Sequence, residues 1–340
     1  MISSHLHGKL KPYHNPDVDT VVSGIMNGDR HMLSRAITLI ESQKPEHEQK
    51  AHEILDRCLS KKKSALRIGI TGSPGAGKST FIEAIGELII SQGLTLAVLA
   101  IDPSSRQSKG SILGDKARME RLTGKKEAFI RPTASSGYLG GTSPKTHEAI
   151  VLCEAAGYDV VIVETVGVGQ SEVLVDTMVD FILLLMLPGS GDELQCIKRG
   201  IMEIADSIAI TKTDGDQSGI AGISRAEFEA ALRMMPVKHI AWHREVMLTS
   251  ALTGKGITEV WQNITDFFAV MRENDTLEKR RREQLKSLLY TVLEEMLKKE
   301  FFSHPDVVDA KATIEQKVLS SEISPFSGAK TLIEAFSRRL

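Results

Sequence analysis

Hydrophobic and polar positions along the centre of the chain follow a pattern that is typical of a sheet covered by helices. From residue 66 to about residue 268, amphipathic segments and glycine turns separate a series of short apolar runs: LRIGIT, LTLAVLAID, DVVIVET, DFILLLML, SIAIT and VMLTS. Nearly continuous apolar runs of this length, spaced by helical stretches, are typical of parallel strands that are buried on both faces. The pattern therefore predicts an α/β domain with a doubly wound, mostly parallel sheet.

Helical spacing replaces this alternation on both sides of the central block. Residues 1–62 mix charged side chains with apolar ones at helical intervals, as in the stretch 32–40. Residues 271–340 place leucines and other apolar side chains along one helical face, beside a basic run at 279–282. We therefore expect an N-terminal helical segment (1–62), an α/β domain (63–270) and a C-terminal helical arm (271–340). The arm is either a packed tail with a solvated basic side or a dimerisation arm.

The overall charge argues against partners that bind by charge alone. The chain of 340 residues carries 42 basic and 44 acidic side chains, so its formal charge of −2 favours neither nucleic acid nor an anionic membrane. The first residues lack the apolar core of a signal peptide, and the run 181–187 is too short to span a bilayer, so the cytoplasm is the expected location. The cysteines Cys58, Cys153 and Cys196 form no CxxC pair and are expected to be reduced thiols.

The strongest chemical signal is a phosphate-binding loop. The sequence GSPGAGKS, residues 72–79, follows the predicted strand LRIGIT and precedes the helical stretch STFIEAIGELII. In a P-loop, glycines let backbone N–H groups turn toward the phosphates, a lysine reaches the β and γ oxygens, and a hydroxyl binds Mg²⁺ at a helix N-terminus. Lys78 is therefore the expected catalytic cation and Ser79 an expected Mg²⁺ ligand. The residues expected to bind the nucleotide are Gly75, Ala76, Gly77, Lys78, Ser79 and Thr80.

Carboxylates at the ends of two predicted strands complete a candidate Mg²⁺ site. Asp102 ends LTLAVLAID and Glu164 ends DVVIVE, where apolar strands meet loops at the carboxyl edge of the sheet. Nucleoside triphosphate chemistry needs such groups because Mg²⁺ keeps near-octahedral oxygen coordination. Each residue alone could be an acid in a turn, but the P-loop makes both of them candidate catalytic and metal-binding groups. Asp115, in a polar loop, is a third candidate that no second signal supports.

The stretch ETVGVGQSE, residues 164–172, is typical of a loop that senses the γ-phosphate. The backbone N–H of Gly167 could donate to that phosphate, as switch loops do. Gln170 is either a catalytic glutamine that positions water or only a residue at the start of a helix, and the sequence favours neither reading.

The stretch SIAITKTD comes at the end of a late predicted strand, which is the position of the guanine-binding loop in a GTPase. Asp214 is expected to accept hydrogen bonds from N1 and the exocyclic amine of guanine, and the stem of Lys212 to lie against the ring. Thr211 stands in place of the usual asparagine and offers one hydroxyl, so we expect a guanine site with weaker loop anchoring. A companion base loop is expected after the predicted strand VML, at Ser250, Ala251 and Leu252.

Taken in order, these motifs resemble those of one family. They are similar to the MeaB/ArgK-like GTPases, relatives of the human methylmalonic aciduria type A protein, in the segments GSPGAGKST, VLAIDPSS, SILGDKARM, RPTASSGYLGGTS, VIVETVGVGQSE, PGSGDELQCIKRGIMEIAD and TKTDGD. The resemblance covers about residues 30–270. It implies a P-loop GTPase similar to the signal-recognition-particle class, with GTP or GDP as ligand and Mg²⁺ as cofactor. It also implies a chaperone that gates cobalamin loading and protects or reactivates an adenosylcobalamin-dependent acyl-CoA mutase.

The resemblance also implies roles for particular residues. The implied Mg²⁺ ligands are Ser79, Asp102, Asp115 and Glu164. A third switch segment is implied at 191–203, in which Asp192, Glu193 and Lys198 pass the nucleotide state to the mutase. Cys196 stands in this segment where glycine is common, which changes its expected flexibility. Homodimerisation through the C-terminal helices is implied as well.

Other functions find less support in the residues. A kinase or transport ATPase acting on basic amino acids would need an acceptor pocket and a preference for ATP, and no motif indicates either. A nickel-type metallochaperone GTPase would usually carry histidine tracts or a Cys-x-x-Cys or Cys-His cluster, and the sequence has none. A non-catalytic scaffold would leave Lys78 and both strand-end carboxylates without a purpose. The mutase itself is ruled out because the sequence has no Asp-x-His-x-x-Gly element and no room for a further barrel of about 250 residues.

Overall fold

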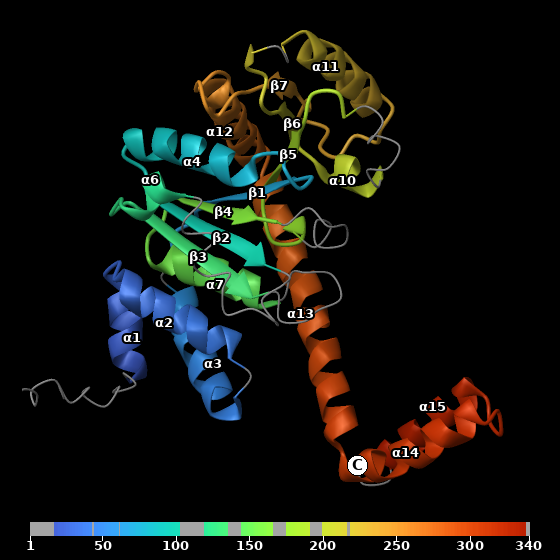
Figure 1. The fold of residues 1–340 in the computed structure, drawn as a ribbon. Coiled ribbons are helices and arrows are strands. Elements are labelled where there is room, and N and C mark those ends of the chain that lie inside the picture. The colour runs from blue at the N-terminus through green and yellow to red at the C-terminus, as the bar shows by residue number, and fades with distance from the viewer. Residues whose placement is uncertain are drawn as a thin grey trace, which may run out of the picture. The chain divides into compact units, whose positions relative to one another are not determined.

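A seven-stranded parallel sheet forms the centre of the fold (Figure 1). The computed structural model describes residues 17–42, 44–60, 62–102, 119–134, 144–165, 175–190, 199–215 and 218–337. The strands are β1 (Leu66–Gly72), β2 (Leu96–Asp102), β3 (Ala128–Ala134), β4 (Val160–Glu164), β5 (Phe181–Met186), β6 (Ser207–Ile210) and β7 (Val246–Leu248). Their order is β3-β2-β4-β1-β5-β6-β7, and every neighbouring pair is parallel. The prediction of a doubly wound parallel sheet is therefore confirmed.

Helices precede the sheet, alternate with its strands and follow it. They are α1 (Val18–Met26), α2 (Arg30–Glu41), α3 (Pro45–Leu59), α4 (Lys78–Ser91), α6 (Glu120–Thr123), α7 (Pro144–Ala155), α10 (Arg199–Ile204), α11 (Ser218–Arg233), α12 (Ile257–Glu273), α13 (Thr276–Ser303), α14 (Pro305–Leu319) and α15 (Pro325–Ser337). Local signals start several of them: the Asp17 carboxylate accepts a hydrogen bond from the Thr20 backbone N–H at α1, and Pro45 opens α3. The predicted helical extensions are present.

Separate apolar clusters cover the two faces of the sheet. On one face, α4 and α12 pack through Phe81, Trp261 and Phe267, among others, against inward residues of the central strands. On the other face, α7 packs on the sheet and the N-terminal helices α1–α3 pack on α7 (Figure 1). Both faces are therefore buried, which explains why the strand sequences are almost continuously apolar.

The edge strand β3 is absent from the apolar runs that the sequence analysis identifies. Its sequence AFIRPTA carries Arg131 and Pro132, which interrupt the apolar pattern. Proline is tolerated here because β3 pairs only with β2 in the described sheet and its other edge is not hydrogen-bonded to a strand. The Arg131 guanidinium donates to the Glu41 carboxylate at 2.7 Å and so ties α2 to this strand.

The chain divides into two compact units, residues 1–281 and 282–340. The first unit holds the sheet, its covering helices and the N-terminal helices, and the second holds most of α13 together with α14 and α15. Within the second unit α14 and α15 pack on each other. The domain boundaries expected at 62/63 and 270/271 stay predictions.

Buried carboxylates fix the strand starts at the edge opposite the site. The Asp206 carboxylate, fully buried before β6, accepts hydrogen bonds from the Ile182 backbone N–H at 2.8 Å and the Lys238 ammonium at 3.0 Å. Burial alone would raise the pKa of Asp206, but Lys238 and His239 outweigh it and hold that pKa below the ordinary 3.8. The Asp180 carboxylate, before β5, pairs in the same way with the Arg281 guanidinium at 2.6 Å.

Candidate active site

The loops of the candidate site meet at the carboxyl edge of the sheet. β1 lies between β4 and β5, where the crossovers turn to opposite sides, and open parallel sheets bind ligands at such a switch point. In the register of the sheet, Glu164 at the end of β4 lies opposite Ile70 of β1 and Ala100 of β2. The strand ends that carry the P-loop, Glu164 and Asp102 are therefore neighbours.

The P-loop has the backbone conformation that its glycines predict. β1 ends at Gly72 and α4 begins at Lys78. Gly75 and Gly77 have φ values of +85° and +82°, a region that costs glycine little and other residues more. Gly72 has a φ of +150°, and a Cβ added there would collide with the Leu185 carbonyl oxygen of β5. Residues larger than glycine would therefore distort this loop.

The Lys78 ammonium lies over the start of the same loop. It donates to the carbonyl oxygen of Gly72 at 2.8 Å and to that of Ser73 at 3.2 Å. These bonds hold the cation at the mouth of the loop, beside the N-terminus of α4, where the helix dipole already favours anions. Charge and backbone N–H groups therefore converge where a P-loop binds phosphate.

A hydroxyl and a carboxylate meet next to this cation. The Ser79 hydroxyl donates to Glu164 Oε1 at 3.0 Å, and Glu164 is half-buried. Oxygen donors of this kind suit Mg²⁺, which prefers hard oxygen ligands. Asp102 is the last residue of the adjacent strand β2, so its backbone stands at the same edge, while Asp115 lies outside the described residues. The described residues thus fit the predicted Mg²⁺ site.

Thr211 ties the base loop to the P-loop. The loop follows β6, and the buried Thr211 hydroxyl lies 2.7 Å from the Ala76 carbonyl oxygen and 3.1 Å from that of Met186. The Thr211 backbone N–H also donates to the Met186 carbonyl oxygen, at 2.8 Å. The Thr211 side chain is 4% exposed and its hydroxyl points at these two carbonyl oxygens. Thr211 therefore anchors the base loop to its neighbours and does not itself contact a nucleotide base.

Asp214 and Ser250 join the two predicted base loops. The Ser250 hydroxyl donates to Asp214 Oδ1 at 2.6 Å, and the Thr213 hydroxyl donates to the Thr249 carbonyl oxygen at 3.1 Å. Lys212 has a φ of +57°. This left-handed backbone conformation is uncommon for residues other than glycine and often occurs in functional loops. Its Cε lies 3.6 Å from where a Cβ on Gly77 would stand, so its stem runs beside the P-loop.

The last predicted residues are Leu252, which the structure describes, and six that it does not. Leu252, which follows Ser250 and Ala251, is 79% exposed at the tip of the companion loop. The remaining candidates, Gly167, Gln170, Asp192, Glu193, Lys198 and Cys196, lie outside the described residues.

One buried contact beside the site is not indicated by any motif in the sequence. Thr165, directly after Glu164, donates its hydroxyl to the Thr71 hydroxyl at 2.9 Å. The available signal was two threonines that follow apolar strand residues immediately beside the two motifs.

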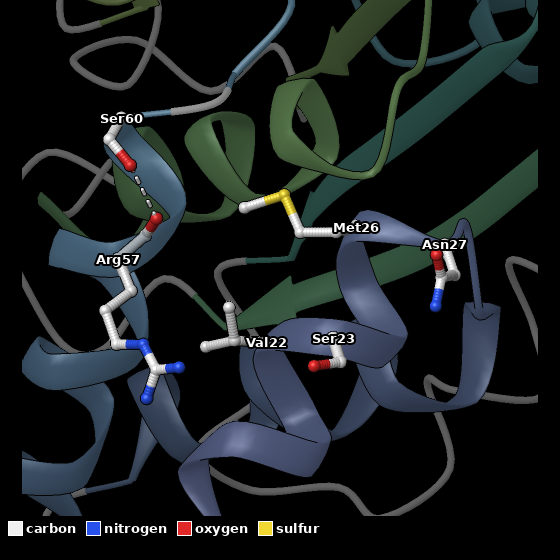
Figure 2. Close-up of a pocket in the computed structure, with 6 residues that line it drawn as sticks. All are labelled: Val22, Ser23, Met26, Asn27, Arg57 and Ser60. Atoms are coloured by element: carbon white, nitrogen blue, oxygen red, sulfur yellow. Dashed lines mark hydrogen bonds between the residues drawn. The ribbon is translucent and has the colours of Figure 1, made fainter.

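A hollow among the N-terminal helices is separate from the candidate active site. It measures about 420 Å³ and is lined by residues of α1, α3 and the turns that follow them (Figure 2). Arg57 stands on its rim and pairs with Asp19 at 2.6 Å, while Val22 and Met26 supply apolar surface. No P-loop residue lines this hollow.

The glycine loop, the lysine above it and the joined base loops define a P-loop GTPase. Comparison with known proteins also identifies the chain as a GTPase. The family model described as methylmalonyl Co-A mutase-associated GTPase MeaB matches residues 33–306. The chain is 43% identical over 332 residues to the mitochondrial methylmalonic aciduria type A homolog of Mus musculus, covering 95% of this chain and 80% of that protein. It is 44% identical over 310 residues to the GTPase ArgK of Escherichia coli, covering 91% and 94%.

A solved structure gives the same result. The chain matches a structure titled as a LAO/AO transport system kinase with a TM-score of 0.73 and 38% identity, covering 93% of this chain and 96% of that one. The protein belongs to the MeaB family of methylmalonyl-CoA mutase-associated GTPases, and it hydrolyses GTP. Among the described helices, none is both long and apolar enough to cross a membrane.

Proposed function

We propose that the protein is a GTP-driven chaperone that gates cobalamin loading into an adenosylcobalamin-dependent acyl-CoA mutase and protects or reactivates that enzyme. One observation carries the proposal: the family model of mutase-associated GTPases matches residues 33–306, a range that includes the P-loop and both base loops. The name of the murine relative, a methylmalonic aciduria type A homolog, supports it. Methylmalonyl-CoA mutase or a close relative is the expected partner.

Nucleotide binding would use residues of the loops at the carboxyl edge of the sheet. Lys78 and the backbone N–H groups of residues 75–80 would hold the phosphates, and Asp214 would read guanine while Ser250 keeps its carboxylate in place. Ser79 and Glu164, with Asp102 and Asp115, would hold Mg²⁺. Bound Mg²⁺ supplies positive charge that neutralises the β and γ oxygens.

Turnover would depend on how these side chains hold the phosphates and an attacking water. Lys78 stabilises charge that grows on the oxygens during phosphoryl transfer, because its ammonium stands at the mouth of the loop before the reaction begins. We propose that Gly167 contacts the γ-phosphate and that Gln170 orients water. Asp192, Glu193 and Lys198 would then pass the nucleotide state to the mutase.

The second unit offers a surface for self-association. Leu289 and Met296 of α13 are 64% and 61% exposed, and Leu285, Leu293 and Leu297 of the same helix are exposed as well. Large apolar side chains gathered on one helix commonly mark an interface. We propose a homodimer formed through these C-terminal helices. The cytoplasmic location stays a prediction.

A loading assay tests the chaperone role. The purified protein is mixed with apo-mutase and adenosylcobalamin, and cofactor binding is followed by its absorbance in the presence of GTP, GDP or ATP. The proposal predicts that loading depends on the guanine nucleotide. Lys78→Ala should abolish that dependence, whereas the control Lys126→Ala, an exposed lysine in the turn before β3, should keep it. Loading that is the same with every nucleotide and in both variants would contradict the proposal.

The ATP arm of the assay also separates a second candidate. The structural relative is titled as a transport system kinase, and a kinase acting on basic amino acids would use ATP. Phosphorylation of arginine or ornithine with ATP, together with no effect on the mutase, would favour that function instead.

A further inference from the structure

Two buried hydroxyls connect the strand that carries the P-loop with the strand that carries Glu164. Thr71 is the next-to-last residue of β1 and is 2% exposed, and Thr165 directly follows β4 and is 1% exposed. The Thr165 hydroxyl donates to the Thr71 hydroxyl at 2.9 Å. The Thr165 backbone N–H also donates to the Ile70 carbonyl oxygen at 3.0 Å, which extends the ladder between β1 and β4 by one bond.

Each threonine of this pair is next in sequence to a residue that contacts the site. Glu164, on one side of Thr165, accepts the hydrogen bond from Ser79. Gly72, directly after Thr71, offers its carbonyl oxygen to the Lys78 ammonium at 2.8 Å. A change in the distance between the two strand ends would therefore move Glu164 relative to the P-loop.

Stability alone does not require hydroxyls at these positions. Val161 and Val163, which share the sheet face of Thr165, are fully buried in an apolar cluster, and valine has the shape of threonine. Replacing both partners of a buried hydrogen bond with apolar groups of the same shape can be nearly neutral or stabilising, whereas replacing one leaves a buried polar group without its partner. Apolar side chains would thus suit the core at least as well.

The hydroxyls allow the ends of β1 and β4 to approach more closely than methyl groups would. The two oxygens are 2.9 Å apart, whereas two methyl groups in contact stand about 4 Å apart. A pair of valines would therefore separate the strand ends by about 1 Å, and a displacement of this size near a reacting group is costly.

We propose that Thr71 and Thr165 are positioning residues that set the distance between Glu164 and the P-loop, and so determine how well Mg²⁺ retains the bound nucleotide. This inference rests on the Mg²⁺ site of the proposed function and does not depend on the proposed role toward a mutase. It assigns a task to two side chains that touch neither phosphate nor metal.

The test measures the release of a fluorescent GDP analogue over a range of Mg²⁺ concentrations, together with the midpoint of urea unfolding. The variants are Thr71→Val, Thr165→Val, the double valine variant and the double serine variant. Ser207→Ala is the control, because Ser207 is also a fully buried hydroxyl in the sheet and donates to the Asn263 side-chain oxygen at 2.7 Å at the start of β6, at the edge opposite the site.

Each single valine variant should unfold at lower urea and need about tenfold more Mg²⁺ to slow GDP release. The double valine variant should recover the unfolding midpoint but keep the tenfold higher Mg²⁺ requirement. The double serine variant, which keeps both hydroxyls, should stay within about twofold of the wild type in its Mg²⁺ requirement, and Ser207→Ala should lower the unfolding midpoint without changing that requirement.

Two results would overturn the inference in distinguishable ways. If the double valine variant regains both stability and the wild-type Mg²⁺ requirement, the pair is only structural. If GDP release from the wild type does not depend on Mg²⁺ at all, the proposed metal site fails and the positioning role fails with it. Neither result bears on whether the protein assists a mutase.

Discussion

Thr211→Val is the sharpest test of how the base loop is anchored. The Thr211 hydroxyl has one proton, and two carbonyl oxygens lie within reach, that of Ala76 at 2.7 Å and that of Met186 at 3.1 Å. Met186 already accepts the backbone N–H of Thr211, so Ala76 depends more on the hydroxyl. Valine keeps the shape of the side chain and removes only this donor.

The expected cost follows from the burial of the bond. Ala76 is fully buried and Thr211 is 4% exposed, so the Ala76 carbonyl oxygen would lose its partner without gaining water. Such a loss costs about 1–2 kcal/mol. An empty P-loop can relax and hydrate, whereas a loop wrapped around phosphates cannot, so most of the cost falls on the bound state. At 1.4 kcal/mol per factor of ten, GDP release should accelerate about five- to thirtyfold.

Stopped-flow displacement of a fluorescent GDP analogue by excess GDP measures this rate directly. Base selectivity should stay unchanged, because the hydrogen bond between Ser250 and Asp214 is untouched. Thr211→Ser keeps the donor and should release GDP close to the wild-type rate. Unchanged release in Thr211→Val, or equal acceleration in Thr211→Ser, would refute the role of the hydroxyl in anchoring the loop.

Three further predictions concern the base, the sheet and the arm. Asp214→Asn should shift preference from guanosine to xanthosine nucleotides in a competition binding assay, because the amide reverses the hydrogen-bonding pattern; retained guanine selectivity would contradict this. Asp206→Asn should lower the free energy of unfolding by about 3 kcal/mol, because it removes the fully buried carboxylate that Lys238 contacts at 3.0 Å and leaves the ammonium only the partly exposed Asp176 carboxylate at 2.9 Å. The folded-state pKa of Asp206 is lowered, so its contribution is fully present above pH 3.8 and is lost as the pH falls below it. Urea titrations of both proteins should therefore converge in acid, and a constant difference would refute the assignment. Leu289→Glu should convert a dimer to a monomer in sedimentation equilibrium, and an unchanged mass would contradict the proposed interface.

The sequence predicts the strands other than β3, and the loop that joins β1 to α4, because buried parallel strands and a P-loop have strong local patterns. The sequence predicts that Thr211 offers its loop a single hydroxyl for anchoring, but only the structure identifies the Ala76 carbonyl oxygen as the partner. The apolar pattern does not reveal β3, because this edge strand contains Arg131 and Pro132, which a central strand would not tolerate.

Contacts between distant parts of the chain could not be predicted. The strand order puts β1 between β4 and β5, and this order brings Thr71 to Thr165, a contact that no motif indicates. The carboxylate of Asp180 before β5 pairs with Arg281 at the start of α13, far along the chain. Such pairs depend on topology, and no local pattern in one sequence encodes them.

The measurement that tests the central claim most directly is GTP turnover by the purified protein, alone and with an adenosylcobalamin-dependent acyl-CoA mutase from the same genome, with ATP as the control. The account predicts slow hydrolysis of GTP alone, a several-fold rise when the mutase is added, and no comparable hydrolysis of ATP. Hydrolysis of ATP in place of GTP, or a rate of GTP hydrolysis that no such mutase changes, would contradict it.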